Sequence, residues 1–314
     1  MRLGTIAFFL ITALANSAAR ADSWTFVQPL PDEKWELGAA TAGDGRIYAI
    51  AGGNQYMPQV TSVFAYDTGS DSWTQVASIS ALRRHFGTAV GNDGRIYVFS
   101  GYHQGFPFFE PSVELYDPIF NYWSRRADIP TPRQGQSAAS APDGRMFVMG
   151  GGMFGDLIPN VDIYDSSTDR WSRGADMPRP RSDFGCVTGP DGRIYVFGGY
   201  AEEGGGDDYS QSADVYDPTA DSWSAISDMN IVRYSVAGSI GADGRIYAIG
   251  GSEGAGAPTS VEAYDPSSDT WTFVASMNAG RSEFAAALGP DGRIYAIGGE
   301  DSYPILSSVE AYNP

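Results

Sequence analysis

Residues 191–199 read Asp-Gly-Arg-Ile-Tyr-Val-Phe-Gly-Gly, and close copies of this stretch recur along the chain. The Asp-Gly-Arg triplet occurs six times at intervals of 48 to 52 residues, beginning at Asp44, Asp93, Asp143, Asp191, Asp243 and Asp291. Tryptophan recurs with the same five spacings, at Trp24, Trp73, Trp123, Trp171, Trp223 and Trp271. Tyrosine keeps the same phase, at Tyr66, Tyr116, Tyr164, Tyr216, Tyr264 and Tyr312. Three markers in one phase indicate a modular architecture with a repeat of about 50 residues.

Each repeat predicts four short strands. Asp-Gly between two apolar runs favours a tight hairpin, because glycine accepts the positive φ that such a turn requires. A small-residue run such as residues 184–187 precedes the turn, and the second strand follows it and ends near a glycine pair. A third strand carries the tyrosine and a fourth carries the tryptophan. No segment has a helical period, so the pattern predicts an all-β fold.

The composition excludes several classes of protein. Of the 314 residues, 42% are hydrophobic, which is ample for a packed core and argues against general disorder. The formal net charge of −18 disfavours general binding to nucleic acid or to anionic membranes, because the average field repels phosphate. Cys186 is the only cysteine, so an intrachain disulfide is impossible. We expect Cys186 to be a small buried side chain and not a nucleophile, since other repeats carry Thr or Ala there.

The glycine pair, the tyrosine and the tryptophan at these offsets resemble the Kelch repeat. The resemblance covers residues 22–314 and implies one six-bladed β-propeller with four strands per blade around a central channel. The sequence opens with a lone fourth strand at residues 23–26 and ends with a third strand at residues 308–312. We therefore expect the N-terminal strand to complete the last blade, which would protect an open sheet edge.

Residues 1–21 have the features of a signal peptide. Arg2 precedes an apolar run at residues 6–14, and Ala19-Arg20-Ala21 fits the small-x-small cleavage rule. The apolar run is shorter than a membrane-spanning helix needs. We expect cleavage after Ala21, a secreted or periplasmic protein without a membrane span, and a monomer.

Two series of residues point to one mouth of the channel. A base stands ten positions before each Asp-Gly-Arg aspartate, and this base ring comprises Lys34, Arg83, Arg133, Arg181, Arg233 and Arg281. Two residues further on stands a second series, here called the channel ring, which comprises Glu36, His85, Gly135, Asp183, Ser235 and Glu283. Unlike the base ring, the channel ring differs from repeat to repeat.

Residues two apart on a strand share a face, so we expect each base to lie beside its channel-ring residue. Asp183 and Glu283 would then pair with the arginines of their own repeats. Arg133 and Arg233 lack such an acid, so we expect them to be free to bind an external carboxylate, for which the planar guanidinium is well suited.

The loops after the glycine pairs carry the other candidates. Residues 102–109 are strongly aromatic, and Tyr102, Phe106 and Phe108 suit either stacking on sugar rings or contact with a protein partner. The loop at residues 200–209 is acidic but lacks the ligand spacing of an EF-hand. We expect no metal site and no cofactor.

The sequence shows no recognisable catalytic constellation, so the leading interpretation is a binding scaffold without catalysis, for a protein or a glycan. One alternative is a periplasmic sugar epimerase or mutarotase that resembles the Kelch-type N-acetylneuraminate epimerases. Ring closure could then bring together Glu36, Glu283, Lys34 and Arg281. A copper enzyme resembling galactose oxidase is disfavoured: that family needs two histidine and two tyrosine ligands, one tyrosine being cross-linked to a cysteine. This chain has only His85 and His103, and its single cysteine is expected on an inner strand.

Overall fold

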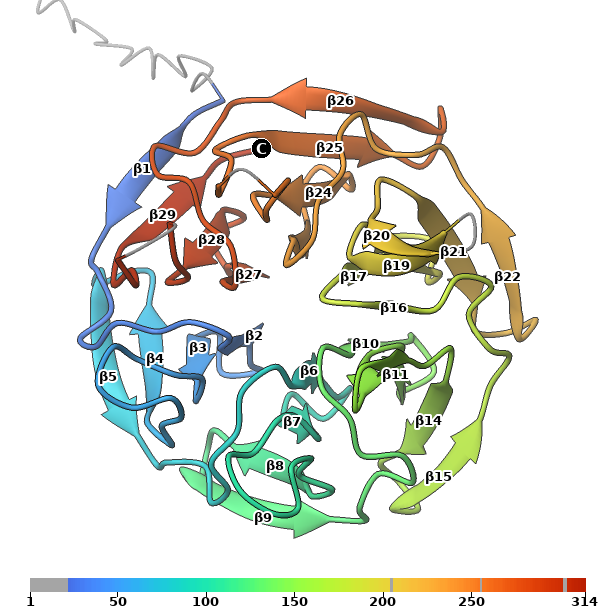
Figure 1. Cartoon of the computed structure of the whole chain (residues 1–314). Helices are drawn as coiled ribbons and strands as arrows, with labels where there is room; N and C mark the ends of the chain where they lie inside the picture. The colour runs from blue at the N-terminus through green and yellow to red at the C-terminus, as the bar shows by residue number, and fades with distance from the viewer. Residues whose placement is uncertain (1–21, 204–205, 255, 302–303) are drawn as a thin grey trace, which may run out of the picture.

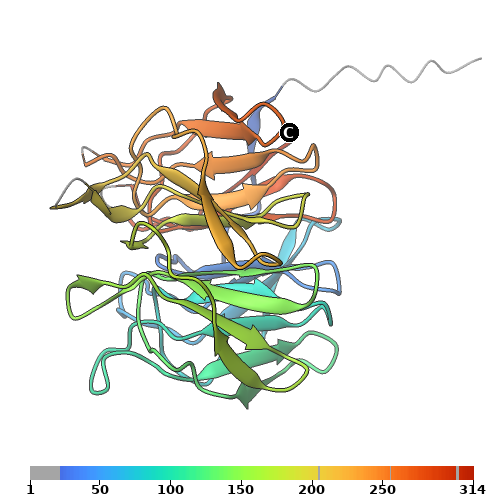
Figure 2. The same ribbon diagram turned by 90° about the vertical axis from the view of Figure 1, so that its right-hand side faces the viewer.

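The computed structural model describes residues 22–203, 206–254, 256–301 and 304–314. The expected signal peptide, residues 1–21, lies outside this part of the chain. Within the described residues the regular elements are all β-strands, and six four-stranded antiparallel sheets stand as blades around a central axis (Figures 1 and 2). The predicted all-β, six-bladed propeller is confirmed.

The first three blades follow the order of the chain. Blade 1 contains β2 (Gly38–Thr41), β3 (Ile47–Ile50), β4 (Val63–Asp67) and β5 (Ser72–Val76). Blade 2 contains β6 (Gly87–Val90), β7 (Ile96–Phe99), β8 (Val113–Asp117) and β9 (Tyr122–Arg126). Blade 3 contains β10 (Ser137–Ser140), β11 (Arg145–Met149), β14 (Val161–Asp165) and β15 (Arg170–Arg173).

The other three blades repeat this order, and the last one joins both ends of the described chain. Blade 4 contains β17 (Gly185–Thr188), β18 (Ile194–Phe197), β21 (Ala213–Asp217) and β22 (Ser222–Ala225). Blade 5 contains β23 (Ala237–Ile240), β24 (Ile246–Ile249), β25 (Val261–Asp265) and β26 (Thr270–Val274). Blade 6 contains β27 (Ala285–Leu288), β28 (Ile294–Ile297), β29 (Val309–Tyr312) and β1 (Trp24–Val27).

Five short strands add to this plan in the loops of blades 3 and 4. A hairpin joins β12 (Gly152–Met153) to β13 (Asp156–Leu157). A three-stranded sheet contains β16 (Arg181–Ser182), β19 (Tyr200–Glu203) and β20 (Gly206–Tyr209). These elements lie at the end of the central channel where the second strand of each blade ends.

The N-terminal strand closes the propeller as predicted. β1 pairs with β29, with Trp24 opposite Tyr312. The indole Nε1 of Trp24 donates a hydrogen bond of 2.9 Å to the carbonyl of Ala275 in the preceding blade. The other five repeat tryptophans make the same link to the blade before their own, at Gln28, Ala77, Ala127, Ala175 and Ser227. Each tryptophan therefore joins neighbouring blades as well as packing within its own.

The Asp-Gly-Arg turns lie at the other end of the strands. In the first copy Gly45 has a φ of +81°, and the Arg46 guanidinium contacts the Asp44 carboxylate at 2.7 Å. The innermost strands (β2, β6, β10, β17, β23 and β27) surround the axis (Figure 1). Their many small residues leave a cavity along the axis. No helix in the described ranges is long and apolar enough to cross a membrane.

Candidate functional site

The base ring is buried inside the blades. All six side chains are fully inaccessible to solvent. In blade 2, Arg83 donates hydrogen bonds to the carbonyls of Ser100 and Ser112 at 3.1 and 2.9 Å. Five of the bases have a carboxylate partner on the third strand of the same blade: Arg83–Glu114, Arg133–Asp162, Arg181–Asp214, Arg233–Glu262 and Arg281–Glu310. The ring is therefore a set of internal braces that join the inner strands.

This placement corrects the expectation that the bases line the channel mouth. Arg133 and Arg233 are not free to bind an external anion, because Asp162 and Glu262 already hold them. Arg181 and Arg281 pair with acids on the third strand and not with Asp183 and Glu283. Two predictions are therefore wrong: that Arg133 and Arg233 bind an external anion, and that Arg181 and Arg281 pair with Asp183 and Glu283.

Backbone conformation explains the error. Every channel-ring residue has a left-handed φ, between 49° at Glu36 and Ser235 and 65° at Gly135. In an extended strand, side chains two residues apart point to the same face. A residue with left-handed φ breaks this alternation of side-chain direction. The base therefore points into its blade while the residue two positions later points into the channel.

Lys34 is the exception within the base ring. Its ammonium donates to the hydroxyl of Ser62 at 2.8 Å and to the carbonyl of Ala51 at 3.1 Å. The ammonium also lies 5.5 Å from the ring centre of Phe64, which replaces the third-strand acid of the other blades. Burial lowers the pKa of Lys34 to about 8, and the nearby charge of Asp32 opposes this only in part.

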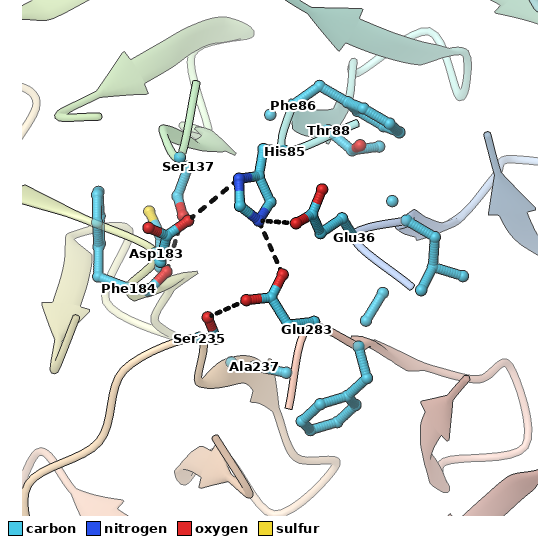
Figure 3. A pocket seen from close by; sticks show the side chains of 18 of the residues that line it. Glu36, His85, Phe86, Thr88, Ser137, Asp183, Phe184, Ser235, Ala237 and Glu283 are labelled. Carbon is cyan, nitrogen blue, oxygen red and sulfur yellow. Dashed lines mark hydrogen bonds and ion pairs between the residues drawn. The ribbon is translucent and has the colours of Figure 1, made fainter. Parts of the chain in front are cut away.

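The channel ring is joined through its backbone. The amide of Glu36 donates to the carbonyl of Glu283 at 2.7 Å, which links blade 1 to blade 6. The amides of His85, Gly135 and Asp183 each donate in turn to the preceding ring residue, at 3.3, 3.0 and 2.8 Å. These bonds link five of the six ring residues, and the side chains of Glu36, His85, Asp183 and Glu283 point toward the axis (Figure 3).

His85 lies at the centre of the ring among three carboxylates (Figure 3). Its Nε2 is 2.9 Å from Glu36 Oε1 and 2.8 Å from Glu283 Oε2, and its Nδ1 is 3.9 Å from Asp183 Oδ1. Ser235 Oγ donates a hydrogen bond of 3.0 Å to Glu283 Oε1. Glu36 Oε1, His85 Nε2 and Glu283 Oε2 are close enough to act as ligands of one metal ion.

The proximity of these groups shifts their pKa values. Burial disfavours the charged imidazole, but Glu36, Asp183 and Glu283 outweigh it and raise the pKa of His85 well above 6.5. Burial would also raise the pKa of Glu283, but the charge and hydrogen bond of His85 lower it to about 2. Burial dominates at Glu36 and Asp183 and raises the pKa of both. The ring therefore favours the charged forms of His85 and Glu283.

A cavity of about 210 Å³ begins at the channel ring and continues along the inner strands. Its walls include Thr88, Ala138, Cys186 and Ala286, which occupy equivalent positions in their repeats. Cys186 is partly exposed there and not fully buried as expected, and the surrounding protein desolvates the thiol enough to raise its pKa to about 12. A thiol of this kind is a poor nucleophile.

A second cavity of about 190 Å³ lies on the loop side, between blades 3 and 4. Asp183 and Gly135 line both cavities. A Cβ added at Gly135 would lie 2.9 Å from Asp183 Oδ1, so the absence of a side chain there leaves room beside the carboxylate. The other lining residues are Gln134, Gly152, Gly155, Asp156, Leu157, Ser182 and Tyr200.

The predicted aromatic loop contributes only indirectly. The guanidinium carbon of Arg84 lies 5.0 Å from the ring centre of Tyr102. The same carbon lies 4.7 Å from the ring centre of Trp35. The same guanidinium contacts Glu36 Oε2 at 2.7 Å. Phe106 and Phe108 are exposed and line neither of the two cavities.

Sequence reasoning missed Arg84, Trp35, Gln134 and Tyr200. The residue between each base and its channel-ring residue also differs from repeat to repeat, and this second varying series would have identified the first three. Tyr200 follows a glycine pair in a loop whose strand pairing is not visible in the sequence.

The geometry separates the two enzymatic alternatives. Glu36 and Glu283 meet, as the epimerase alternative requires, but Lys34 and Arg281 are buried in their blades. The described lining of the larger cavity holds one histidine and no tyrosine, so the ligand set of a galactose-oxidase-like copper centre is not assembled there.

Comparisons with known proteins agree with this fold. A family model described as the Kelch motif matches residues 37–80, 135–178, 180–230, 237–278 and 283–314. A solved structure titled "Structure of YjhT" is similar with a TM-score of 0.74 and 16% sequence identity, covering 92% of this chain and 95% of that one. Identity at this level shows a common fold alone. A search of the curated proteins found no match. Motifs that match more than half of the sequence, together with six equivalent blades, show that the chain belongs to the family of proteins built from Kelch repeats.

Proposed function

We propose that this protein is a glycan-binding propeller that holds one neutral or amino-bearing sugar unit in the loop-side cavity between blades 3 and 4. The observation that carries the proposal is that Asp183, Gln134 and the exposed Tyr200 line one hollow. Carboxylate and amide groups suit sugar hydroxyls, and an aromatic face suits stacking on a sugar ring.

The size of the cavity supports recognition of a single unit. Its volume of about 190 Å³ lies below the roughly 300–1,000 Å³ typical of pockets that enclose a whole drug-sized ligand. The ligand would therefore place one unit in the hollow and extend across the loops. Phe154, which is 75% exposed, lies on the adjoining hairpin and offers a further apolar surface.

Charge supports a ligand without an acidic group. The channel ring contributes three carboxylates and one imidazole, and Arg84 adds one positive charge beside Glu36. Asp156 adds another acid to the loop-side cavity. Local potential repels anions where carboxylates are in excess, and the whole chain is strongly acidic as well.

A glycan array followed by calorimetric titration of the best ligand tests this proposal. We expect Tyr200→Ala and Asp183→Asn each to weaken binding at least ten-fold. Tyr56→Ala and Asp128→Asn are matched controls, because both residues are exposed and neither lines the cavity. The proposal fails if no neutral or amino sugar binds, or if the controls weaken binding as much as the site variants do.

A second candidate function is sugar mutarotation, because the imidazole of His85 and the three carboxyl groups around it place an acid and a base at one point. A carboxylate would remove the proton from the anomeric hydroxyl while an imidazolium protonates the ring oxygen, so the ring opens and can close on either face. Saturation-transfer NMR on aldoses would reveal faster exchange of the anomers. Exchange that persists unchanged in His85→Gln would exclude this role.

We also propose that the protein is exported. This rests on the signal features of residues 1–21, which lie outside the described residues. N-terminal sequencing of the protein from its native cells should find a chain beginning at Asp22, whereas an intact N-terminus would contradict export.

A further inference from the structure

The two acids and the histidine at the centre of the channel ring present three donor atoms to one point. Glu36 Oε1 and Glu283 Oε2 each lie within 2.9 Å of His85 Nε2, and the possible donor atoms of the three residues lie within 4.8 Å of one another. Zinc bonds to imidazole nitrogen and carboxylate oxygen at about 2.0–2.2 Å. Small outward shifts of these side chains would therefore accommodate a central ion.

Hydrogen bonding alone does not satisfy this arrangement fully. A nitrogen of an imidazole carries at most one hydrogen, yet His85 Nε2 faces two carboxylate oxygens. That nitrogen can therefore donate fully to only one of the two oxygens, and the hydrogen bond is the one to Glu283. A divalent cation in the same place would contact all three donor atoms and offset the negative charge of both acids.

The outer atom of each of these side chains faces a partner of its own. Glu36 Oε2 lies 2.7 Å from the Arg84 guanidinium, and Glu283 Oε1 accepts a hydrogen bond from Ser235 at 3.0 Å. His85 Nδ1 faces Asp183 Oδ1 at 3.9 Å. Metal-binding histidines and carboxylates are usually oriented by outer contacts, and a carboxylate beside the second imidazole nitrogen is one recurring form. The contacts leave the three inner atoms directed at the shared point (Figure 3).

An independent feature of the cavity indicates a bound group. Gln136 is only 4% exposed and lines the same cavity. Its Nε2 donates to the carbonyl of Phe99, but its Oε1 has no hydrogen-bond partner among the described residues. Within the same part of the chain the Thr88 hydroxyl, in the same wall, also lacks a partner. Buried acceptors are costly when unpaired, so these atoms suit a ligand that donates hydrogens, such as metal-bound water.

We propose that Glu36, His85 and Glu283 bind one divalent transition-metal ion, with zinc(II) favoured by the ligand set and an open coordination position toward the channel cavity. Calcium and magnesium prefer oxygen ligands alone, whereas one imidazole with two carboxylates suits zinc and its neighbours in the first transition series. The site departs from the expectation, drawn from sequence, that the chain binds no metal. The three proposed ligands line the channel cavity and not the loop-side cavity of the glycan proposal, and Asp183 is the residue that the two proposals share.

Calorimetric titration of tag-free, chelator-treated protein with zinc chloride tests the proposal directly, and cobalt(II) provides a second readout through its visible d–d absorption. We expect one equivalent of zinc to bind and cobalt to give an absorption band that zinc abolishes. His85→Gln and Glu283→Gln should remove both signals, and Asp183→Asn should weaken zinc binding about 10- to 100-fold as an outer contact.

His103→Gln is the matched control, because His103 is the only other histidine of the chain and lies outside the ligand set. It should bind zinc like the wild type. The proposal is overturned if the wild type neither binds zinc nor gives the cobalt band. It is also overturned if His103→Gln loses binding as fully as His85→Gln, or if folded Glu36→Gln, Glu283→Gln and His85→Gln all keep wild-type affinity.

Discussion

The base ring and the channel ring lie two residues apart in every repeat, yet they have opposite environments. The bases point into the blades and are fully buried, and five of the six pair with an acid of their own blade. The channel-ring residues point to the axis, where side chains from different blades contact one another. A single left-handed backbone conformation separates the two environments.

This difference shows how a repeat protein divides its residues between scaffold and site. The base ring hardly varies, because every blade needs the same internal brace. The channel ring varies because the mouth of the channel is a single place to which each repeat contributes one side chain. The six side chains can therefore differ, as a site with several kinds of group requires. A position that departs from its own repeats is therefore a better guide to function in such a fold than a position that obeys them.

The largest effect should come from breaking a brace. Arg133→Ala leaves the carboxylate of Asp162 buried without its partner, so we expect the free energy of unfolding to fall by about 3–5 kcal/mol. Arg125→Ala removes an exposed ion pair with Asp128 and should cost less than about 1 kcal/mol. Denaturant midpoints of the two variants measure the difference. Similar losses would show that the buried brace has no special role.

A second prediction concerns Lys34, the brace without an acid. Its pKa is about 8 in the folded protein and 10.5 in an unfolded chain, so the unfolded state binds more protons between these values. Stability due to Lys34 must then rise with pH across this window. Relative to Lys34→Met, the wild type should gain about 3 kcal/mol between pH 8 and 10.5. A constant difference between the two proteins would show that the ammonium is not destabilised by burial.

Two acids of blade 4 offer a sharper comparison. Asp214→Asn weakens the brace to Arg181 and should cost about 2 kcal/mol of stability. Asp183→Asn should change stability by less than about 1 kcal/mol, because burial already disfavours the charged carboxylate, as its raised pKa shows. Thermal melts at pH 7 compare the two. If Asp183→Asn lowers the melting temperature more than Asp214→Asn does, the assignment of Asp214 to the scaffold and Asp183 to the site is wrong.

The smallest effect is expected at Cys186. Its thiol has a pKa of about 12, so almost no thiolate is present at pH 8. The native protein should react with a thiol reagent far more slowly than the unfolded protein does. Equal rates in the two states would mean that the channel wall is open and polar at this point.

The sequence predicted the fold well because the markers of the repeat act through local geometry. Asp-Gly turns, tyrosines and tryptophans recur in phase, and the lone strand at each end implies closure of blade 6. It also singled out Glu36, His85, Asp183 and Glu283, since they break the repeat, and the structure brings these four side chains together. The direction of the arginines was predicted wrongly, because alternation along a strand does not reveal a left-handed residue at its start. The loop-side cavity could not be predicted, because it depends on how β12, β13 and β19 fold over Gly135.

The titration of His85, followed by NMR in metal-free protein, tests the central claim most directly. His103→Gln assigns the signal, since the chain has only two histidines. Because Glu36, Asp183 and Glu283 surround the imidazole, we predict a pKa well above 6.5, which Glu283→Gln should lower. A pKa at or below 6.5, unchanged in Glu283→Gln, would contradict the claim that the channel ring gathers these side chains at one mouth.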